Sequence, residues 1–159
     1  MAQQRTNWGY GLAAWLATGG GIGYAPIAPG TFGTLLGIPL HLVLARLSPG
    51  AYAAAVLVLF LAGVWLCSVA EARLGQRDHP AIVWDEIVGY QITVWLAPGG
   101  WFWIAVGFAL FRLFDVWKPF PIRRIEHLPR GLGAMTDDAL AGVYAFAVLQ
   151  AAAWLAAAR

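Results

Sequence analysis

The sequence predicts an all-α membrane protein, in which about four to five membrane-embedded helices form a multi-pass bundle. Hydrophobic residues make up 60% of the 159 residues and charged residues 11%, against about 45–50% and about 25% in soluble domains. So little charge cannot cover a water-facing surface. One segment, Ala51 to Ala70, has Ser68 as its only polar residue. A helix of that length crosses the roughly 30 Å of hydrocarbon in a bilayer.

The first expected hairpin joins this segment to a shorter apolar run, Thr34 to Leu47. The turn Ser48-Pro49-Gly50 lies between them, and all three residue types are common in turns. Two helices joined by so short a connection are expected to run antiparallel.

A second hairpin and a final helix follow. The chain is apolar from Ile87 to Ala97, breaks at Pro98-Gly99-Gly100, and is apolar again from Trp101 to Phe114. The first of these arms is shorter than the ~20 residues of a full crossing, so whether it spans the bilayer stays open. The last run, Ala139 to Ala158, is again of spanning length. Residues 1–159 together are the size of a single domain.

The basic residues can be sorted by side, because each hairpin returns the chain to the side from which it started. Two of them, Arg46 and Arg159, fall on one side. The other side holds Arg5, Arg73, Arg77, Arg112, Lys118, Arg123, Arg124 and Arg130. Basic residues are enriched in cytoplasmic loops, so this second side is expected to be cytoplasmic. The net charge of +2 gives no basic stripe of the kind that nucleic-acid binding requires.

All eight carboxylates of the chain fall in the segments assigned to the cytoplasmic side. Five stand where a polar stretch meets an expected helix, and ionisable residues so close to hydrocarbon indicate a function. The five candidates are Asp85, Glu86, Asp115, Asp137 and Asp138.

Four of these acids form two similar pairs, each expected to open an apolar helix. A glycine follows four residues after an Asp in both, at Gly89 and Gly142, and leaves space on the same helical face for a ligand or a neighbouring helix. Acids at a helix N-terminus can also simply complement the helix dipole, worth about 0.3–1 kcal/mol. Two pairs together with Asp115, in a chain so poor in charge, favour a functional site.

A cation is expected among these acids. Carboxylates gathered at one spot repel each other, and the repulsion grows as water is excluded. Carboxylate oxygens suit Mg²⁺, which usually takes one or two carboxylates together with substrate phosphate. All five acids are therefore candidate Mg²⁺ ligands and candidate catalytic residues.

Basic residues that could bind a phosphate lie close by in the sequence. Arg112, Asp115 and Lys118 recur every three residues, which predicts one stripe of a helix that ends before Pro119. Such a stripe fits a plain ion-pair ladder, but an Arg and a Lys beside a cation are also what phosphoryl oxygens require.

Two weaker signals concern Thr31 and Cys67. Thr31 lies in a Gly- and Pro-rich segment before the first apolar run, where a helix N-terminus could seat a phosphate or merely be capped. Cys67 and Arg73 have the spacing of cysteine-dependent phosphatases. That chemistry needs a loop of free backbone amides, whereas Cys67 continues an apolar helix, so we do not expect a nucleophilic thiol.

Four stretches of the chain carry a family resemblance. They are Pro26 to Thr34 (PIAPGTFGT), Ile82 to Gly89 (IVWDEIVG), Phe111 to Ile122 (FRLFDVWKPFPI) and Gly131 to Gly142 (GLGAMTDDALAG). In order and spacing they resemble the motifs of the bacterial phosphatidylglycerophosphatase A family, and the resemblance extends from about Trp8 onward. Ala134, where a larger aliphatic residue is expected, and Glu126, where an Asp is expected, depart from the pattern.

The resemblance implies an α-helical, Mg²⁺-dependent lipid phosphatase of the bacterial inner membrane, with its site on the cytoplasmic face. Such an enzyme hydrolyses phosphatidylglycerophosphate to phosphatidylglycerol and inorganic phosphate. The five acids carry over as the catalytic and metal-binding set. The candidate phosphate ligands are Thr31, Arg112, Lys118 and Arg123. The substrate and the lipid bilayer are the expected partners, and the oligomeric state stays open.

Two mechanisms and several other functions remain as alternatives. Either a cation-activated water attacks phosphorus, or an Asp attacks it and forms an aspartyl-phosphate. A small transporter or ion-coupled channel subunit would also use membrane carboxylates, but it predicts them near mid-bilayer rather than at helix ends. The motif of CDP-linked alcohol phosphotransferases is absent, and a membrane scaffold would have no use for concentrated acids.

Overall fold

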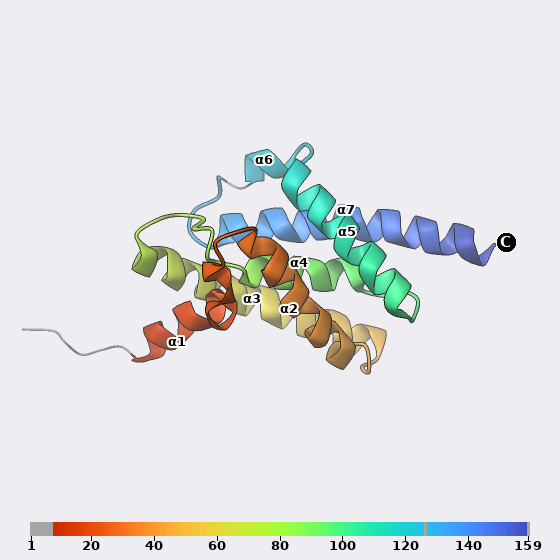
Figure 1. Cartoon of the computed structure of the whole chain (residues 1–159), viewed down its shortest axis with the longest axis horizontal. Helices are drawn as coiled ribbons and strands as arrows, with labels where there is room; N and C mark the ends of the chain where they lie inside the picture. The colour runs from red at the N-terminus through yellow and green to blue at the C-terminus, as the bar shows by residue number, and fades with distance from the viewer. Residues whose placement is uncertain (1–7, 126, 159) are drawn as a thin grey trace, which may run out of the picture.

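A computed structural model describes residues 8–125 and 127–158, and within this part of the chain every regular element is a helix (Figure 1). The all-α fold class is therefore confirmed. The elements in order are α1 (Trp8–Ala17), the 3₁₀ helix η1 (Gly19–Tyr24), α2 (Pro29–Leu44), α3 (Pro49–Leu74), α4 (Trp84–Val94), α5 (Trp101–Trp117), α6 (Ile122–Ile125) and α7 (Leu132–Ala157).

Helices α2 and α3 begin earlier than their apolar runs predicted, and each begins with a proline. Proline suits the first helical position, because its φ is already helical and its missing N–H would have no partner there. The hydroxyl of Ser48 accepts a hydrogen bond from the amide of Ala51 at 3.3 Å and caps α3. Gly75, with φ 72°, ends that helix in a left-handed conformation.

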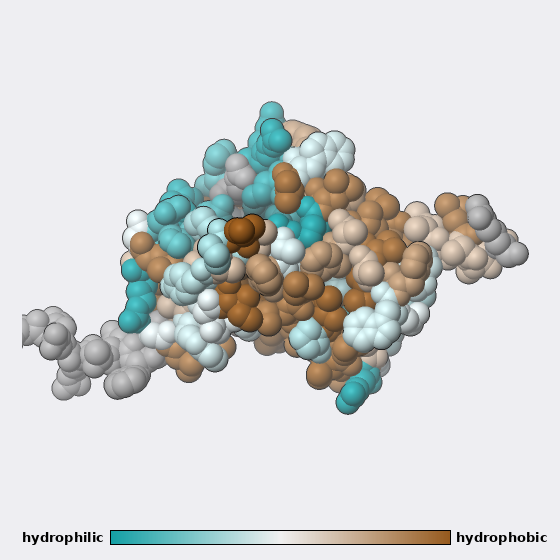
Figure 2. Space-filling view, viewed as in Figure 1, coloured by the Kyte–Doolittle hydropathy of each residue, from teal (hydrophilic) through white to brown (hydrophobic). Residues whose placement is uncertain are grey.

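Helices α3 and α7 are both long and apolar enough to cross a membrane. Each has 26 residues, or about 39 Å of helix. Only 28% of the apolar stretch in each is buried, whereas a core helix of a soluble protein would be mostly buried. Apolar residues cover much of the middle and right of the molecule in Figure 2, while hydrophilic residues gather at the upper left. This is the surface expected of lipid-facing helices.

Helix α4 is a core helix and does not cross a bilayer on its own. Its 11 residues make about 16 Å of helix, about half the hydrocarbon thickness. Eight of the eleven are buried, because α2, α3, α5 and α7 all pack against it. The apolar pattern of this arm reflects burial among protein helices.

The two expected hairpins differ in their packing. Helices α4 and α5 contact each other, as predicted. Helices α2 and α3 are joined by a short turn, but both pack against α4 more closely than against each other. Small residues permit the α2–α4 contact: a Cβ on Gly33 would lie 2.6 Å from Cβ of Val83, and one on Gly37 would lie 2.7 Å from the ring of Tyr90.

A buried polar network ties α2, α3 and α4 together. The hydroxyl of Tyr52 lies 3.1 Å from Nδ1 of His41 and 3.1 Å from Oε1 of Gln91. The Gln91 amide in turn donates to the carbonyl of Gly37 at 2.8 Å. Because these groups are away from water, each needs a protein partner, and the network fixes the three helices relative to one another.

One end of the bundle collects the segments that were assigned to the cytoplasmic side. The loop between α3 and α4, helix α6 and the start of α7 all lie toward the left or top of Figure 1, whereas the α2–α3 and α4–α5 turns lie toward the right. The acidic residues of α4 and α7 therefore belong to the same end of the molecule.

Candidate functional site

The site is built where α4 crosses α7 at very short range. A Cβ on Gly89 would lie 2.7 Å from the carbonyl oxygen of Asp138, and a Cβ on Gly142 would collide with the carbonyl oxygen of Gly89. Both glycines thus serve one of the two uses expected from the sequence, which is the close approach of a neighbouring helix. The crossing sets the first turn of α4 beside Asp138.

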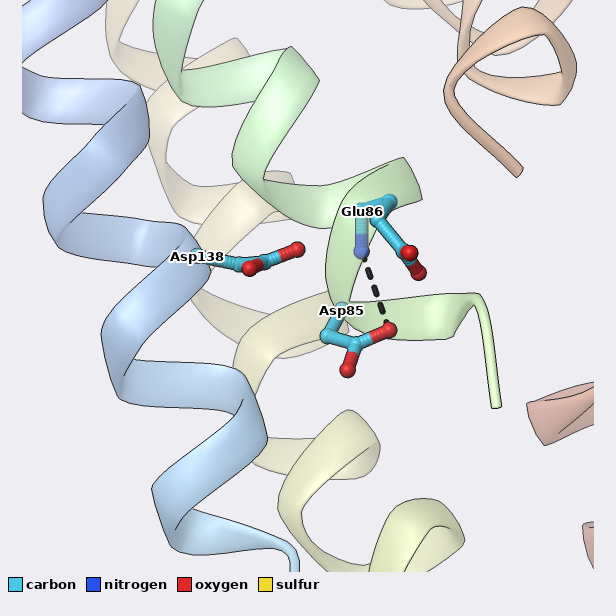
Figure 3. A group of neighbouring side chains, drawn as sticks. All are labelled: Asp85, Glu86 and Asp138. Carbon is cyan, nitrogen blue, oxygen red and sulfur yellow. Dashed lines mark hydrogen bonds between the residues drawn. The ribbon is translucent and has the colours of Figure 1, made fainter. Parts of the chain in front are cut away.

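Three carboxylates converge at this crossing. Asp85 and Glu86 come from the first turn of α4, and Asp138 points toward them from α7 (Figure 3). One carboxylate oxygen from each residue lies within 4.8 Å of the other two. Asp85 is 6% exposed and Asp138 5%, so water screens their mutual repulsion poorly. We call these three residues the acidic cluster.

The hydrogen bonds around the acidic cluster leave two oxygens without a partner. Oδ1 of Asp85 accepts from the amide of Glu86 at 3.1 Å. Among the described residues, Oε2 of Glu86 and Oδ2 of Asp138 are buried and accept no hydrogen bond. A buried polar group without a partner is costly, and more so when it is charged. These two oxygens therefore still need a positive charge or a hydrogen-bond donor.

A divalent cation that prefers oxygen ligands fits this arrangement. Carboxylates from two separate helices offer oxygens to one point, and no His or Cys belongs to the group that the described residues form. Zinc usually takes nitrogen or sulfur ligands, whereas Mg²⁺ and Mn²⁺ suit carboxylates. The two oxygens without partners are the groups that such a cation would neutralise.

The other two predicted acids each pair with a basic residue. Oδ2 of Asp137 lies 2.6 Å from Nζ of Lys118, and Oδ2 of Asp115 lies 2.5 Å from Nη1 of Arg112.

The expectation that the Asp137–Asp138 pair opens a helix is wrong, because α7 already begins at Leu132. The helix dipole at an N-terminus therefore does not explain that pair.

Arg112 contacts the acidic cluster directly, whereas Lys118 contacts a residue beside it in the chain. Nη1 of Arg112 lies 4.0 Å from Oε1 of Glu86 as well as contacting Asp115. Lys118 does not continue the predicted helical stripe, because it takes a left-handed conformation (φ 45°) at the end of α5, just before Pro119. From there it reaches Asp137, the neighbour of Asp138 in the chain.

The remaining candidates lie farther out. Thr31 sits in the first turn of α2, and its backbone amide donates to the carbonyl of Ala28 at 3.0 Å, so that amide is not free for a phosphate. Arg123, on α6, donates to the carbonyl of Trp117 at 3.3 Å. With Lys118 it lines a surface hollow of about 460 Å³. Glu126 lies outside the described residues.

Sequence reasoning missed the part that Gly30 plays. A Cβ on Gly30 would collide with Oε1 of Glu86 and lie 3.0 Å from Nη1 of Arg112. Glycine therefore lets the start of α2 lie against these two side chains without displacing them. The available signal was the spacing of Gly30, Gly33 and Gly37, which places small residues along a helix face that approaches another helix.

Comparisons with known proteins assign the chain to a family. The family model described as phosphatidylglycerophosphatase A matches residues 15–153. Phosphatidylglycerophosphatase A of Escherichia coli (strain K12) is 41% identical over 136 residues, which cover 84% of this chain and 79% of that protein. The Haemophilus influenzae protein of the same name is 45% identical over 137 residues, covering 84% of each.

A third relative carries a different name. A Bacteroides thetaiotaomicron protein, provisionally named phosphatidylinositol-3-phosphatase, is 40% identical over 152 residues, covering 91% of this chain and 95% of that protein. No solved structure matches the chain significantly. On the family model and the first two relatives, this chain belongs to the phosphatidylglycerophosphatase A family.

Proposed function

We propose that this protein removes the terminal phosphate of phosphatidylglycerophosphate and releases phosphatidylglycerol and inorganic phosphate. Membership of the family and the names of two relatives support this substrate. The observation that carries the chemistry is the acidic cluster, with two buried oxygens that lack partners. The transporter alternative has no such support, because these relatives are named as phosphatases.

The acidic cluster is proposed to hold Mg²⁺ through Asp85, Glu86 and Asp138. Their oxygens already lie close enough to share one ion. When bound, such a cation neutralises charge on a phosphomonoester and makes water a better nucleophile. Asp115 and Asp137 are better placed as partners of Arg112 and Lys118 than as ligands, because each contacts its basic residue directly.

Arg112 and Lys118 are proposed to bind the phosphoryl oxygens. Each is held by a carboxylate before any substrate arrives. Donors that are fixed in advance stabilise developing charge without having to reorganise during the reaction. Thr31 and Arg123 stay as outer candidates, the first beside Gly30 at the start of α2 and the second beside the hollow that Lys118 lines.

The membrane arrangement is part of this proposal. Helices α2, α3, α5 and α7 are embedded in the bacterial inner membrane around α4, and the end with the acidic cluster faces the cytoplasm. The distribution of basic residues supports this orientation. The diacylglycerol of the substrate then stays in the bilayer, while its headgroup reaches the cluster at the membrane surface.

In the hydrolysis we propose, a water oxygen attacks phosphorus, the bond from phosphorus to the glycerol oxygen breaks, and that oxygen takes up a proton. The alternative is attack by an Asp, which leaves a phosphoryl group on the protein for water to remove in a second step. An acid-quenched single turnover, followed by mass analysis of the protein, separates the two. Direct water attack predicts no phosphorylated protein at any time.

Phosphate release from phosphatidylglycerophosphate, measured with purified protein in detergent, tests the function. Activity is expected with Mg²⁺, and it should disappear with EDTA and in Asp138→Asn. Asp78→Asn is the matched control, because Asp78 is an exposed acid outside the acidic cluster. Phosphatidylinositol 3-phosphate is tested as a second substrate, because one relative is named as a phosphatase of that lipid. Faster release from that lipid, or activity that survives EDTA, would contradict the proposal.

A further inference from the structure

A hollow with basic residues at one end is lined by residues outside the acidic cluster. This hollow, of about 1440 Å³, opens between α1, the C-terminal part of α3 and residues 129–130. Asp85, Glu86 and Asp138 do not line it. Neither the family motifs nor the proposed reaction uses this hollow.

One wall of the hollow is apolar. Leu12 and Trp15 of α1 and Trp65 of α3 line it, and each is 55–56% exposed. Large apolar side chains left this open are unusual on a water-facing surface but common where a helix faces lipid. Tryptophan in particular gathers where the hydrocarbon of a membrane meets the headgroups.

The polar end of the hollow is basic. Arg73, Arg77 and Arg130 line it together with a single carboxylate, Glu71. Arg77 donates to the carbonyl of Leu128 at 2.8 Å. Arg73 and Arg130 are exposed, and no acidic residue in the described part of the chain forms an ion pair with either. Two guanidinium groups beside an apolar wall are thus able to bind an anion.

We infer that this hollow binds an anionic phospholipid of the surrounding leaflet. Arg73 and Arg130 hold the headgroup phosphate, since guanidinium groups suit phosphate oxygens geometrically. An acyl chain lies over Leu12, Trp15 and Trp65. A soluble phosphate would use only the basic end, whereas a lipid uses both surfaces. Arg73 lies in the last turn of α3, one of the two helices able to cross a membrane, where basic pockets meet lipid headgroups.

Native mass spectrometry in an uncharged detergent tests this inference, with short-chain phosphatidylglycerol as the probe and phosphatidylcholine of the same chains beside it. Arg73→Gln/Arg130→Gln should bind phosphatidylglycerol about 30-fold more weakly than the original protein, from the usual contribution of a basic residue near anionic lipid. Arg46→Gln, which changes an exposed arginine outside the hollow, should bind normally. Arg73→Lys/Arg130→Lys should bind more tightly than the glutamine variant, because it keeps the charge, but less tightly than the original protein, because it loses the guanidinium geometry.

Further binding experiments test whether a soluble phosphate occupies the hollow, or whether the lipid binds at the acidic cluster instead. Glycerol 1-phosphate should not displace the lipid, and equal competition would show a site for soluble phosphate and overturn the inference. The lipid should also remain bound in Asp85→Asn/Asp138→Asn, whereas its loss there would assign it to the acidic cluster. Unchanged phosphatidylglycerol binding by a folded Arg73→Gln/Arg130→Gln protein, checked by circular dichroism and size-exclusion chromatography, would equally refute it. Because binding is measured without turnover, these outcomes do not depend on the proposed reaction.

Discussion

Replacing Gly30 by alanine tests the architecture of the acidic cluster without substituting any of its three acidic residues. The new methyl group would collide with Oε1 of Glu86 and lie 3.0 Å from Nη1 of Arg112. Both atoms are at the ends of long side chains, so they can move aside without shifting a helix. The substitution therefore displaces Glu86 from the shared point of the cluster and leaves the fold in place.

The expected magnitudes differ sharply between stability and activity. Overpacking a site costs about 1–3 kcal/mol when the surroundings are rigid, and a flexible side chain brings the cost to the low end. Alanine also favours a helix by up to about 1 kcal/mol over glycine, so the free energy of unfolding should change by less than about 1 kcal/mol. A displacement of about 1 Å in a catalytic group can lower the rate about 100-fold.

The assay compares kcat for phosphate release and its dependence on Mg²⁺ concentration in Gly30→Ala and Gly50→Ala. Gly50 is the matched control, because it also follows a proline in the first turn of a helix, yet a Cβ there meets nothing within 4 Å. Gly30→Ala should lose activity and require more Mg²⁺, while Gly50→Ala behaves as the original protein. Equal activity and equal Mg²⁺ dependence in the two variants would refute the reasoning.

Four substitutions probe the charges and the core. Without divalent cations, Asp138→Asn should raise the thermal unfolding temperature, because it removes one of three repelling carboxylates, and an unchanged or lower temperature would argue against that repulsion. Lys118→Ala removes the cation from Asp137, whose side chain is 3% exposed, and should destabilise the protein by about 3 kcal/mol in denaturant titration. Adding Asp137→Asn should recover much of that stability but not the activity, and full recovery of activity would exclude Lys118 from phosphate binding. Tyr52→Phe breaks the buried bond to Gln91 and should cost about 1–3 kcal/mol with kcat unchanged, so a large drop in kcat would contradict a purely structural role.

The sequence predicted the acidic end of the molecule but not which acids meet. Successive residues on a helix point about 100° apart, so the motif Asp137-Asp138 places one carboxylate inward and the other to the side. Which of the two faces α4 depends on the rotation of α7, and that is set by the Gly89–Gly142 contact. In the structure Asp138 joins the cluster, and Asp137 reaches Lys118 instead.

The length of α4 and the position of Lys118 could not be predicted for different reasons. Apolar composition looks the same whether a helix is surrounded by lipid or by protein, so the sequence could not show that α4 is a short core helix. The helical stripe of Arg112, Asp115 and Lys118 assumed that the helix continues to its last member. Lys118 instead adopts a left-handed conformation, and this turns its side chain toward α7.

Cation binding by the acidic cluster is most directly measured with Mn²⁺, by electron paramagnetic resonance on the original protein, Asp138→Asn and Asp78→Asn. The original protein and Asp78→Asn should bind Mn²⁺ that Mg²⁺ displaces, and Asp138→Asn should bind it at least about tenfold more weakly, because one of three shared carboxylates is gone. Equal Mn²⁺ affinity in Asp138→Asn and the original protein would contradict the assignment of Asp85, Glu86 and Asp138 as the metal site.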